Sequence, residues 1–148
     1  MSVSIWKREG FEISTDLERL DKGWLLGALA KTYWAAENTP ETLWNSIQHA
    51  RGYGIYGSDG AQVGFARAVT DMARFAWISD VVIDDAARGR GLGKWLMETM
   101  VSDPALRTVH LWTLATDDAH GLYEQSGFGL TAKSELAEQF MHLKRQKM

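Results

Sequence analysis

The chain has 148 residues, of which 45% are hydrophobic and 24% charged, and this composition is ordinary for one globular domain, predicted over residues 1–148. The net charge of −3 argues against nucleic acid as a partner, and no apolar run approaches the ~20 residues that span a bilayer. We therefore expect a cytoplasmic protein without a nucleic-acid or membrane partner. With no cysteine and no histidine pair at helical spacing, disulfides, a thiolate nucleophile and a metal site are not expected.

The first third of the chain predicts a short strand and two helices. Residues 10–14 have the composition of a strand. Thr15 and Glu18 have the spacing of a capping box, in which each side chain satisfies a backbone N–H at a helix start, and apolar residues follow at loose helical spacing. Thr39 and Pro40 predict the start of a second helix, because threonine is a good N-cap and proline suits the first helical position.

The middle of the chain predicts three strands. Residues 53–56 and 62–70 have strand-like patterns and flank Asp59-Gly60, a dipeptide typical of hairpin turns. Residues 74–83 predict a longer strand that ends in an apolar run. A glycine-rich loop follows, and then an apolar pattern at helical spacing.

The last third predicts two further strands around a helix. Residues 108–114 have the pattern of a buried strand, and residues 117–125 that of a helix closed by Gly127, where left-handed backbone ends helices. Residues 132–147 carry helical spacing, but residues 140–144 also alternate, and we favour a final strand there. The order β-α-α-β-β-β-α-β-α-β-β predicts an α/β fold with a mixed sheet and helices on both faces.

The most informative segment is the glycine-rich loop between a predicted strand and a predicted helix. It consists of Arg88-Gly89-Arg90-Gly91-Leu92-Gly93-Lys94. Glycines let backbone N–H groups approach an anion, and the helix start adds partial positive charge. Three basic side chains stand in these seven positions of an otherwise acidic chain. Together these features predict a phosphate or pyrophosphate ligand.

Two common phosphate-binding motifs do not fit this loop. A Walker A loop requires glycine where Arg88 stands, and serine or threonine where Trp95 stands. The dinucleotide-binding fingerprint requires a third glycine where Lys94 stands, and it follows the first strand of its fold rather than a late one. The loop therefore belongs to another class of phosphate site.

The spacing of Arg88, Gly91 and Gly93 resembles the acetyl-CoA loop of the GNAT N-acetyltransferase superfamily, Gln/Arg-x-x-Gly-x-Gly/Ala. Residues 119–128 are similar to that family's second signature, Ala-x-x-Leu-Tyr-x-x-x-Gly-Phe, and the resemblance covers residues 53–128 in family order. It implies the family's mostly antiparallel, twisted sheet of about seven strands. It also implies transfer of an acetyl or short acyl group from acetyl-CoA to a primary amine of a small molecule.

The resemblance implies a set of cofactor-binding residues on the third long strand, in the loop and before the last helix. They are Val81, Val82, Ile83, Arg88, Gly89, Arg90, Gly91, Leu92, Gly93, Lys94 and Thr116. The main-chain N–H of Val82 is expected to stabilise the oxyanion, because the family has a bulge in this strand. Thr116 stands where the family often has asparagine, so that cofactor contact stays open.

The resemblance assigns Tyr123 as the general acid at the cofactor sulfur, and a phenol suits this role because it is protonated at neutral pH. The alternative is a ring that only packs under the sheet. Without cysteine, direct attack in a ternary complex is favoured, although a serine ester is not excluded. Asp80, the only residue within Phe75–Ile83 with an ionisable side chain, is a candidate base or an exposed residue on the far face. Glu37 is a weaker candidate, and His120 either contacts the pantetheine arm or faces solvent.

Three aromatic residues, Tyr33, Trp34 and Trp77, are candidates for the acceptor pocket, with burial in the core as the alternative for each. Two other functions remain open. A GNAT domain can bind a CoA thioester as a sensor or interaction module without turnover, and a protein or peptide can be the acyl acceptor. A homodimer is expected only because twofold dimers are common among soluble proteins.

Overall fold

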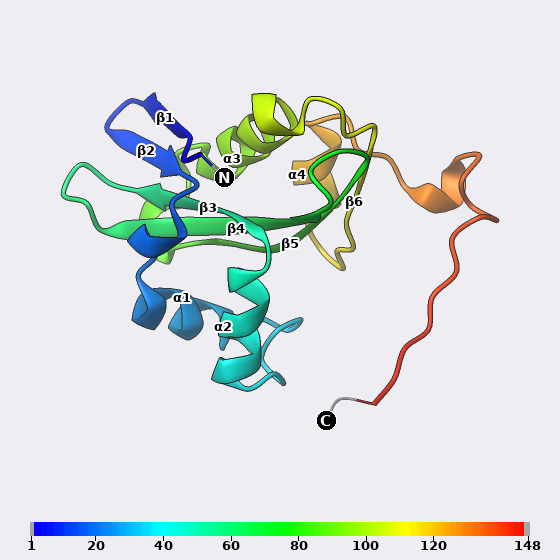
Figure 1. Ribbon diagram of the computed structural model, residues 1–148, viewed down its shortest axis with the longest axis horizontal. Helices are drawn as coiled ribbons and strands as arrows, with labels where there is room; N and C mark the ends of the chain where they lie inside the picture. Colours follow the sequence, from blue (N-terminus) through cyan, green and yellow to red (C-terminus); the bar gives the residue numbers. More distant parts are fainter. Residues whose placement is uncertain (1, 147–148) are drawn as a thin grey trace. The chain divides into compact units, whose positions relative to one another are not determined.

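The computed structural model describes residues 2–146, which form two compact units that meet in sequence between Ala115 and Thr116. The first unit contains a sheet with helices on both faces (Figure 1). Its helices are α1 (Lys22–Leu29), α2 (Pro40–Gln48) and α3 (Leu92–Val101); the second unit contains α4 (His120–Glu124). None of the helices in residues 2–146 is long and apolar enough to cross a membrane.

The sheet of the first unit has six strands in the order β1-β2-β3-β4-β5-β6. They are β1 (Ile5–Arg8), β2 (Phe11–Ser14), β3 (Arg51–Tyr56), β4 (Gln62–Thr70), β5 (Phe75–Ile83) and β6 (Leu111–Thr113). Neighbouring strands are antiparallel from β1 to β5, and β6 is parallel to β5. The predicted mixed, mostly antiparallel α/β fold is therefore confirmed, with six strands instead of about seven.

The first strand of the sheet is the one that the sequence did not predict. β1 and β2 form a hairpin around Glu9 and Gly10, whose φ angles are 47° and 86°. Two successive positive φ angles produce the turn that matches the twist of a hairpin. The predicted strand at residues 10–14 corresponds to β2, and β1 was missed because glutamate is an unusual residue at this turn position.

The start of the first helix differs from the predicted capping box. Asp21 caps α1, and its carboxylate accepts a hydrogen bond from the backbone N–H of Trp24 at 3.0 Å. Thr15 is not a cap, because its hydroxyl accepts a hydrogen bond from the N–H of Ser4 at 2.9 Å. The intervening residues form a short 3-10 helix, Leu17–Arg19. Thr15 thus fastens the N-terminal hairpin, and two aspartates, Asp16 and Asp21, take over the capping.

The second helix begins as predicted, with Thr39 as its N-cap. The Thr39 hydroxyl accepts a hydrogen bond from the N–H of Thr42 at 3.1 Å, and Pro40 occupies the first helical position. We expect Thr39→Ala to lower the free energy of unfolding by about 1 kcal/mol, because it leaves an N–H at the helix start without a partner. Urea denaturation would measure the loss. Thr42→Ala keeps the cap and is the control, and an equal loss in both variants would contradict the assignment.

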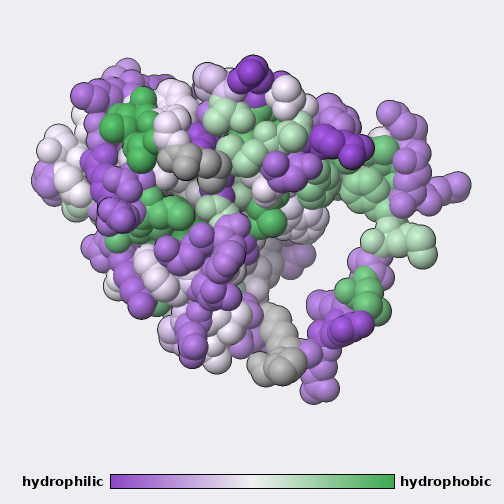
Figure 2. All heavy atoms as spheres, in the orientation of Figure 1, coloured by the Kyte–Doolittle hydropathy of each residue, from purple (hydrophilic) through white to green (hydrophobic). Residues whose placement is uncertain are grey.

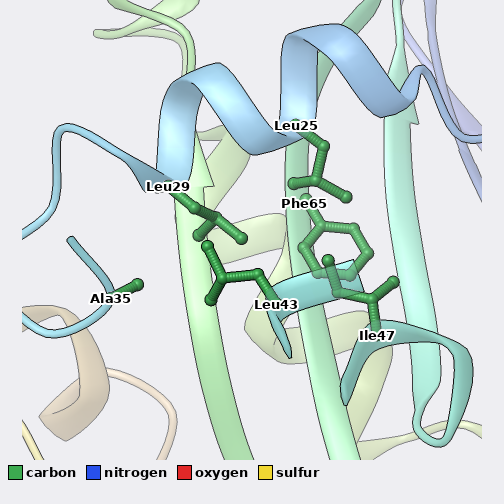
Figure 3. Close-up of a cluster of buried hydrophobic side chains, with 6 residues drawn as sticks. All are labelled: Leu25, Leu29, Ala35, Leu43, Ile47 and Phe65. Atoms are coloured by element: carbon green, nitrogen blue, oxygen red, sulfur yellow. The ribbon is translucent and has the colours of Figure 1, made fainter. Parts of the chain in front are cut away.

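One face of the sheet is covered by α1 and α2. Their apolar side chains enclose Phe65 of β4 in a buried cluster (Figure 3). The cluster consists of Leu25, Leu29, Ala35, Leu43, Ile47 and Phe65. Complete burial of a leucine, isoleucine or phenylalanine side chain contributes roughly 1.5–3 kcal/mol, so this cluster fixes both helices on the sheet.

The other face of the sheet is covered by α3, which contacts β5. Six residues of α3 are buried: Leu92, Trp95, Leu96, Met97, Thr99 and Met100. A buried polar cluster lies nearby in the chain, where Asp103 accepts hydrogen bonds from Arg51 Nε at 2.8 Å and from the Tyr53 hydroxyl at 2.6 Å. Burial and the neighbouring carboxylate raise the pKa of Tyr53, so its phenol stays protonated and serves the fold.

In the second unit, α4 is shorter than the predicted helix over residues 117–125, and Gly127 follows it with φ of 93°. The predicted final strand at residues 140–144 is wrong, because this segment is neither strand nor helix. Its apolar residues are exposed, including Met141 at 95% and Leu143 at 77%. Alternation alone does not make a strand, since a strand is stabilised by a paired neighbour. The helical alternative extended to residue 147, which lies outside the described residues.

Candidate active site

The glycine-rich loop connects β5 to α3 and ends in an uncapped helix start. Gly89 and Gly91 have φ angles of 80° and 71°, a conformation that other residues rarely adopt. Gly91 is the N-cap of α3, and no side chain caps the helix. The first N–H groups of a helix have no partner within it, so an uncapped start offers several donors to an anion. A Cβ at either glycine would meet nothing within 4 Å, which shows that the backbone here faces open space.

The basic side chains of the loop are exposed beside this helix start. Arg88 forms an exposed ion pair with Asp85 at 3.2 Å, and the guanidinium of Arg90 lies 5.9 Å from the centre of the Phe11 ring. Lys94 is exposed on the first turn of α3. A cavity of about 340 Å³ borders the loop and is lined by Arg8, Glu9, Phe11, Arg90, Gly91, Leu92 and Trp95. The loop therefore combines free backbone donors, positive charge and space, as a pyrophosphate requires.

β5, the strand before the loop, is paired with β6 over only its first three residues. β5 pairs with β6 only from Phe75 to Trp77, although β5 continues to Ile83. Within the first unit the remainder of β5 thus has no strand on its β6 side. Its backbone N–H and C=O groups can bind an extended ligand that carries amides, as an added strand would. Val81, Val82 and Ile83 lie on this free part of the strand and are half-buried.

β5 also contains the bulge that the family resemblance implied. Phe65 of β4 pairs with Val82, but Arg67 pairs with Ser79, so Asp80 and Val81 both lie opposite Ala66. Asp80 has a φ of 56°, in the left-handed region. In a bulge the extra residue is not paired in the ladder, which redirects its backbone groups. Val82 pairs with Phe65, so the two residues of the bulge without a register partner are Asp80 and Val81.

Asp80 is buried, and the exposed alternative for it is therefore excluded. One carboxylate oxygen accepts a hydrogen bond from Arg67 Nε at 2.6 Å, and the other accepts one from Trp34 Nε1 at 3.0 Å. The Asp80 side chain is only 3% exposed. It thus connects the bulge to β4 and to the segment between α1 and α2. Arg67 had not been identified from the sequence, because only the strand register places it beside the bulge.

The three aromatic candidates for an acceptor pocket are not in the core. Tyr33, Trp34 and Trp77 are 54%, 38% and 38% exposed. The rings of Tyr33 and Trp34 meet edge to face, with centroids 4.9 Å apart. Glu37, the weaker base candidate, is exposed in the segment before α2. The structure therefore brings Trp34 to Asp80, with Nε1 of the indole donating to the carboxylate.

The second family signature lies in the second unit. Tyr123 is buried, and its ring contacts that of Phe128 with centroids 6.1 Å apart. Thr116 accepts a hydrogen bond from the N–H of Ala119 at 3.1 Å, so it orders the turn before α4, whose N-cap is Ala119. His120 is exposed at the first position of α4. The described part of the chain contains no group of three potential metal ligands.

Comparison with known proteins supports the family resemblance. Residues 48–129 match the family model for the acetyltransferase (GNAT) domain. The candidate acetyltransferase FG08082 of Gibberella zeae is 28% identical over 138 residues, which cover 78% of this chain and 77% of that protein. The crystal structure of a candidate GNAT-family acetyltransferase from Xanthomonas campestris pv. campestris is 34% identical, with a TM-score of 0.85 over 94% of this chain and 96% of that one.

A more distant structure adds a ligand to the comparison. A Clostridium acetobutylicum protein, solved with acetyl-CoA, shares the fold at 12% identity, with a TM-score of 0.61 over 97% of this chain and 96% of that one. On the family model and the fold together, the chain belongs to the GNAT acetyltransferase family.

Proposed function

We propose that this chain transfers an acetyl or other short acyl group from acyl-CoA to the primary amine of a small molecule, in a ternary complex. The observation that carries the proposal is the free part of β5, which contains a bulge and is followed, after the short 3-10 helix Asp85–Ala87, by an uncapped, glycine-rich helix start. This arrangement provides a linear row of backbone donors and acceptors that ends at an anion site.

In this proposal the loop from Arg88 to Lys94 binds the pyrophosphate of the cofactor through backbone N–H groups and positive charge. The backbone of Val81, Val82 and Ile83 binds the amides of the pantetheine arm, and Thr116 contributes a further contact. The thioester supplies an activated acyl carbon when it is bound. The fit rests on two observations, the missing side-chain cap at Gly91 and the missing strand partner beyond Trp77.

The oxyanion that develops on the acyl oxygen is stabilised by a main-chain N–H at the bulge. Val82 is the donor that we propose, with Val81 as its neighbour in the bulge. A backbone donor that is already fixed in place needs no reorganisation during the reaction, and removal of such a donor typically costs ~10²–10³ in kcat. The fixed carboxylate of Asp80 holds this part of the backbone, because it is bonded to both Arg67 and Trp34.

Two side chains are proposed to move protons. Tyr123 donates its phenolic proton to the departing sulfur while the C–S bond breaks and the N–C bond forms. Asp80 accepts the proton that the amine nitrogen loses, directly or through a water molecule. Proton exchange with solvent then restores both groups. No cysteine is available for an acyl-enzyme, which supports direct attack by the amine.

The role of Asp80 is tested by comparing kcat at saturating substrate in Asp80→Asn and Trp34→Phe. We expect Asp80→Asn to lower kcat less than removal of the general acid does, because this carboxylate is already engaged by two donors. Trp34→Phe is the matched control, since it removes one of these hydrogen bonds and keeps the carboxylate, and we expect it to lower kcat less than Asp80→Asn does. An equal loss of kcat in the two variants would show that Asp80 only positions the bulge.

The proposed function is tested by thiol release from acetyl-CoA with a panel of amines, amino acids, aminoglycosides and short peptides, beside a thermal-shift scan with acetyl-CoA. Ligand at 100 times its Kd is expected to stabilise the protein by about 2.7 kcal/mol. A thermal shift with turnover of an amine supports the enzyme. A thermal shift without turnover favours a CoA-thioester sensor, and turnover of peptides alone favours a protein acetyltransferase. No thermal shift would overturn the assignment of the loop.

A further inference from the structure

An apolar strip on the sheet remains uncovered by the two helices of its face. The strip consists of Val69 of β4 and of Phe75 and Trp77 of β5, which are 41%, 41% and 38% exposed. Strand alternation places Val69 on the same face as Phe65, which is buried under α1 and α2. By contrast, hydrophilic and intermediate side chains form most of the outer surface of these helices (Figure 2). An exposed group of large apolar side chains on a sheet face is typical of a binding surface.

The strip is continuous with the bulge. Val69 and Trp77 are register partners, so their side chains lie side by side, and the next such pair on this face towards the bulge is Arg67 and Ser79. Trp77 precedes Asp80 by three residues on β5, which corresponds to about 10 Å along a strand. A molecule of modest length can therefore lie on the strip and reach the bulge with one end.

The indole of Trp34 extends the apolar surface to the bulge. Its Nε1 donates to Asp80 at 3.0 Å, and this hydrogen bond holds the ring beside the carboxylate. Tyr33 packs edge to face on the same indole. Aromatic rings thus stand on the segment between α1 and α2 and on β5, the strand that carries Asp80. Flat, rigid aromatic side chains of this kind provide large contact area at a low entropic cost.

The charges at this surface are already paired. Asp80 and Arg67 form an ion pair at 2.6 Å, with side chains only 3% and 16% exposed. Val69, Phe75 and Trp77 carry no charge, and the carboxylate of Asp71, which precedes Phe75 by four residues, already accepts hydrogen bonds from three backbone N–H groups. An acceptor with several ammonium groups would lose hydration there without electrostatic compensation. The surface therefore favours an amine whose remaining part is uncharged and apolar.

We propose that the acyl acceptor is a primary amine with a single charge and an aromatic body, which lies on the apolar strip while its amine reaches the bulge. This inference rests on the proposed function and specifies its substrate class. A spacer of a few carbon atoms between the ring and the nitrogen suits the separation of Trp77 and Asp80. Polyamines and aminoglycosides are poor acceptors by the same argument.

Steady-state thiol release with phenylbutylamine, tryptamine, butylamine and spermidine tests the inference. We expect kcat/KM for the two aromatic amines to exceed that for butylamine and spermidine by roughly tenfold or more, since one well-buried ring contributes about that much. Trp77→Ala should raise the KM of phenylbutylamine about tenfold and leave the KM of acetyl-CoA and of butylamine unchanged. Val101→Ser is the control, because Val101 is an exposed apolar residue of α3, outside the strip.

Direct binding separates this inference from the proposed function. Phenylbutylamine is expected to shift the NMR signals of the Trp77 indole and the Val69 methyl groups, whereas equal concentrations of spermidine do not. If acetyl-CoA fails to bind while these signals still shift, the proposed function is wrong and the strip remains an amine site. Preferred turnover of spermidine, or unchanged signals with phenylbutylamine, would overturn the inference. So would a concentration-dependent dimer, seen in sedimentation, that Trp77→Ala dissociates.

Discussion

Gly91→Glu is expected to abolish the binding of acetyl-CoA and to leave the protein folded. Gly91 is the N-cap of α3, has a φ of 71° and borders open space. A glutamate side chain there adds bulk and a negative charge at the positive end of the helix, where the pyrophosphate is proposed to bind. The left-handed backbone costs a residue with a Cβ roughly 1–2 kcal/mol, which a folded domain tolerates. Calorimetric titration with acetyl-CoA measures the loss.

Two control variants separate charge from backbone strain. Gly91→Ala imposes the same backbone cost without the charge, and we expect it to bind acetyl-CoA with an affinity close to that of the wild type. Gly60→Glu adds the same side chain at a glycine with a φ of 84° and open space, in the β3–β4 hairpin. It should leave binding unchanged. Normal affinity in Gly91→Glu would refute the loop assignment, and equal losses in the alanine and glutamate variants would attribute the effect to strain.

Tyr123→Phe is expected to lower kcat by about 10²-fold, the lower end of the range for general acid catalysis, with little change in the affinity for acetyl-CoA. The substitution removes only the hydroxyl and keeps the ring that contacts Phe128, so the packing of the second unit is preserved. Single-turnover kinetics at saturating acetyl-CoA and amine would isolate the chemical step from product release.

Tyr56→Phe is the matched control for this experiment. It removes a hydroxyl from a buried tyrosine of β3 that has no proposed part in binding or proton transfer. We expect its kcat to equal that of the wild type. If kcat is unchanged in Tyr123→Phe as well, Tyr123 only packs against its neighbours and another group protonates the sulfur. If the affinity for acetyl-CoA falls in parallel with kcat, the hydroxyl binds the cofactor instead.

The elements that were predicted correctly are determined by residues within or next to them in the sequence. β4 was predicted with its observed bounds, because Asp59-Gly60 marks the turn and the strand pattern is long. The start of α2 depends on Thr39 and Pro40 alone, and the start of α3 follows a glycine loop. Residues that carry such signals determine their own conformation. Sequence reasoning therefore recovered the loop and the strand that leads into it.

The parts that were missed depend on contacts across the chain. The predicted strand at residues 140–144 had the required alternation, but no neighbour pairs with it. The environment of Asp80 depends on Arg67, which is 13 residues earlier, and on Trp34, which is 46 residues earlier. The bulge shifts the register between β4 and β5 by one residue. No local pattern encodes that shift, so the burial of Asp80 could not be deduced from its own strand.

The free edge of β5 has a second consequence, for the colloidal behaviour of the protein. Unpaired strand edges are templates for strands of other molecules, and many proteins protect them with charges, bulges or covering segments. Here the edge contains a bulge and is followed in the chain by the basic residues Arg88 and Arg90, which repel an identical loop. A bound ligand that occupies the edge completes this protection. Bound acyl-CoA would then protect the protein against aggregation through this edge, in addition to its proposed role as a substrate.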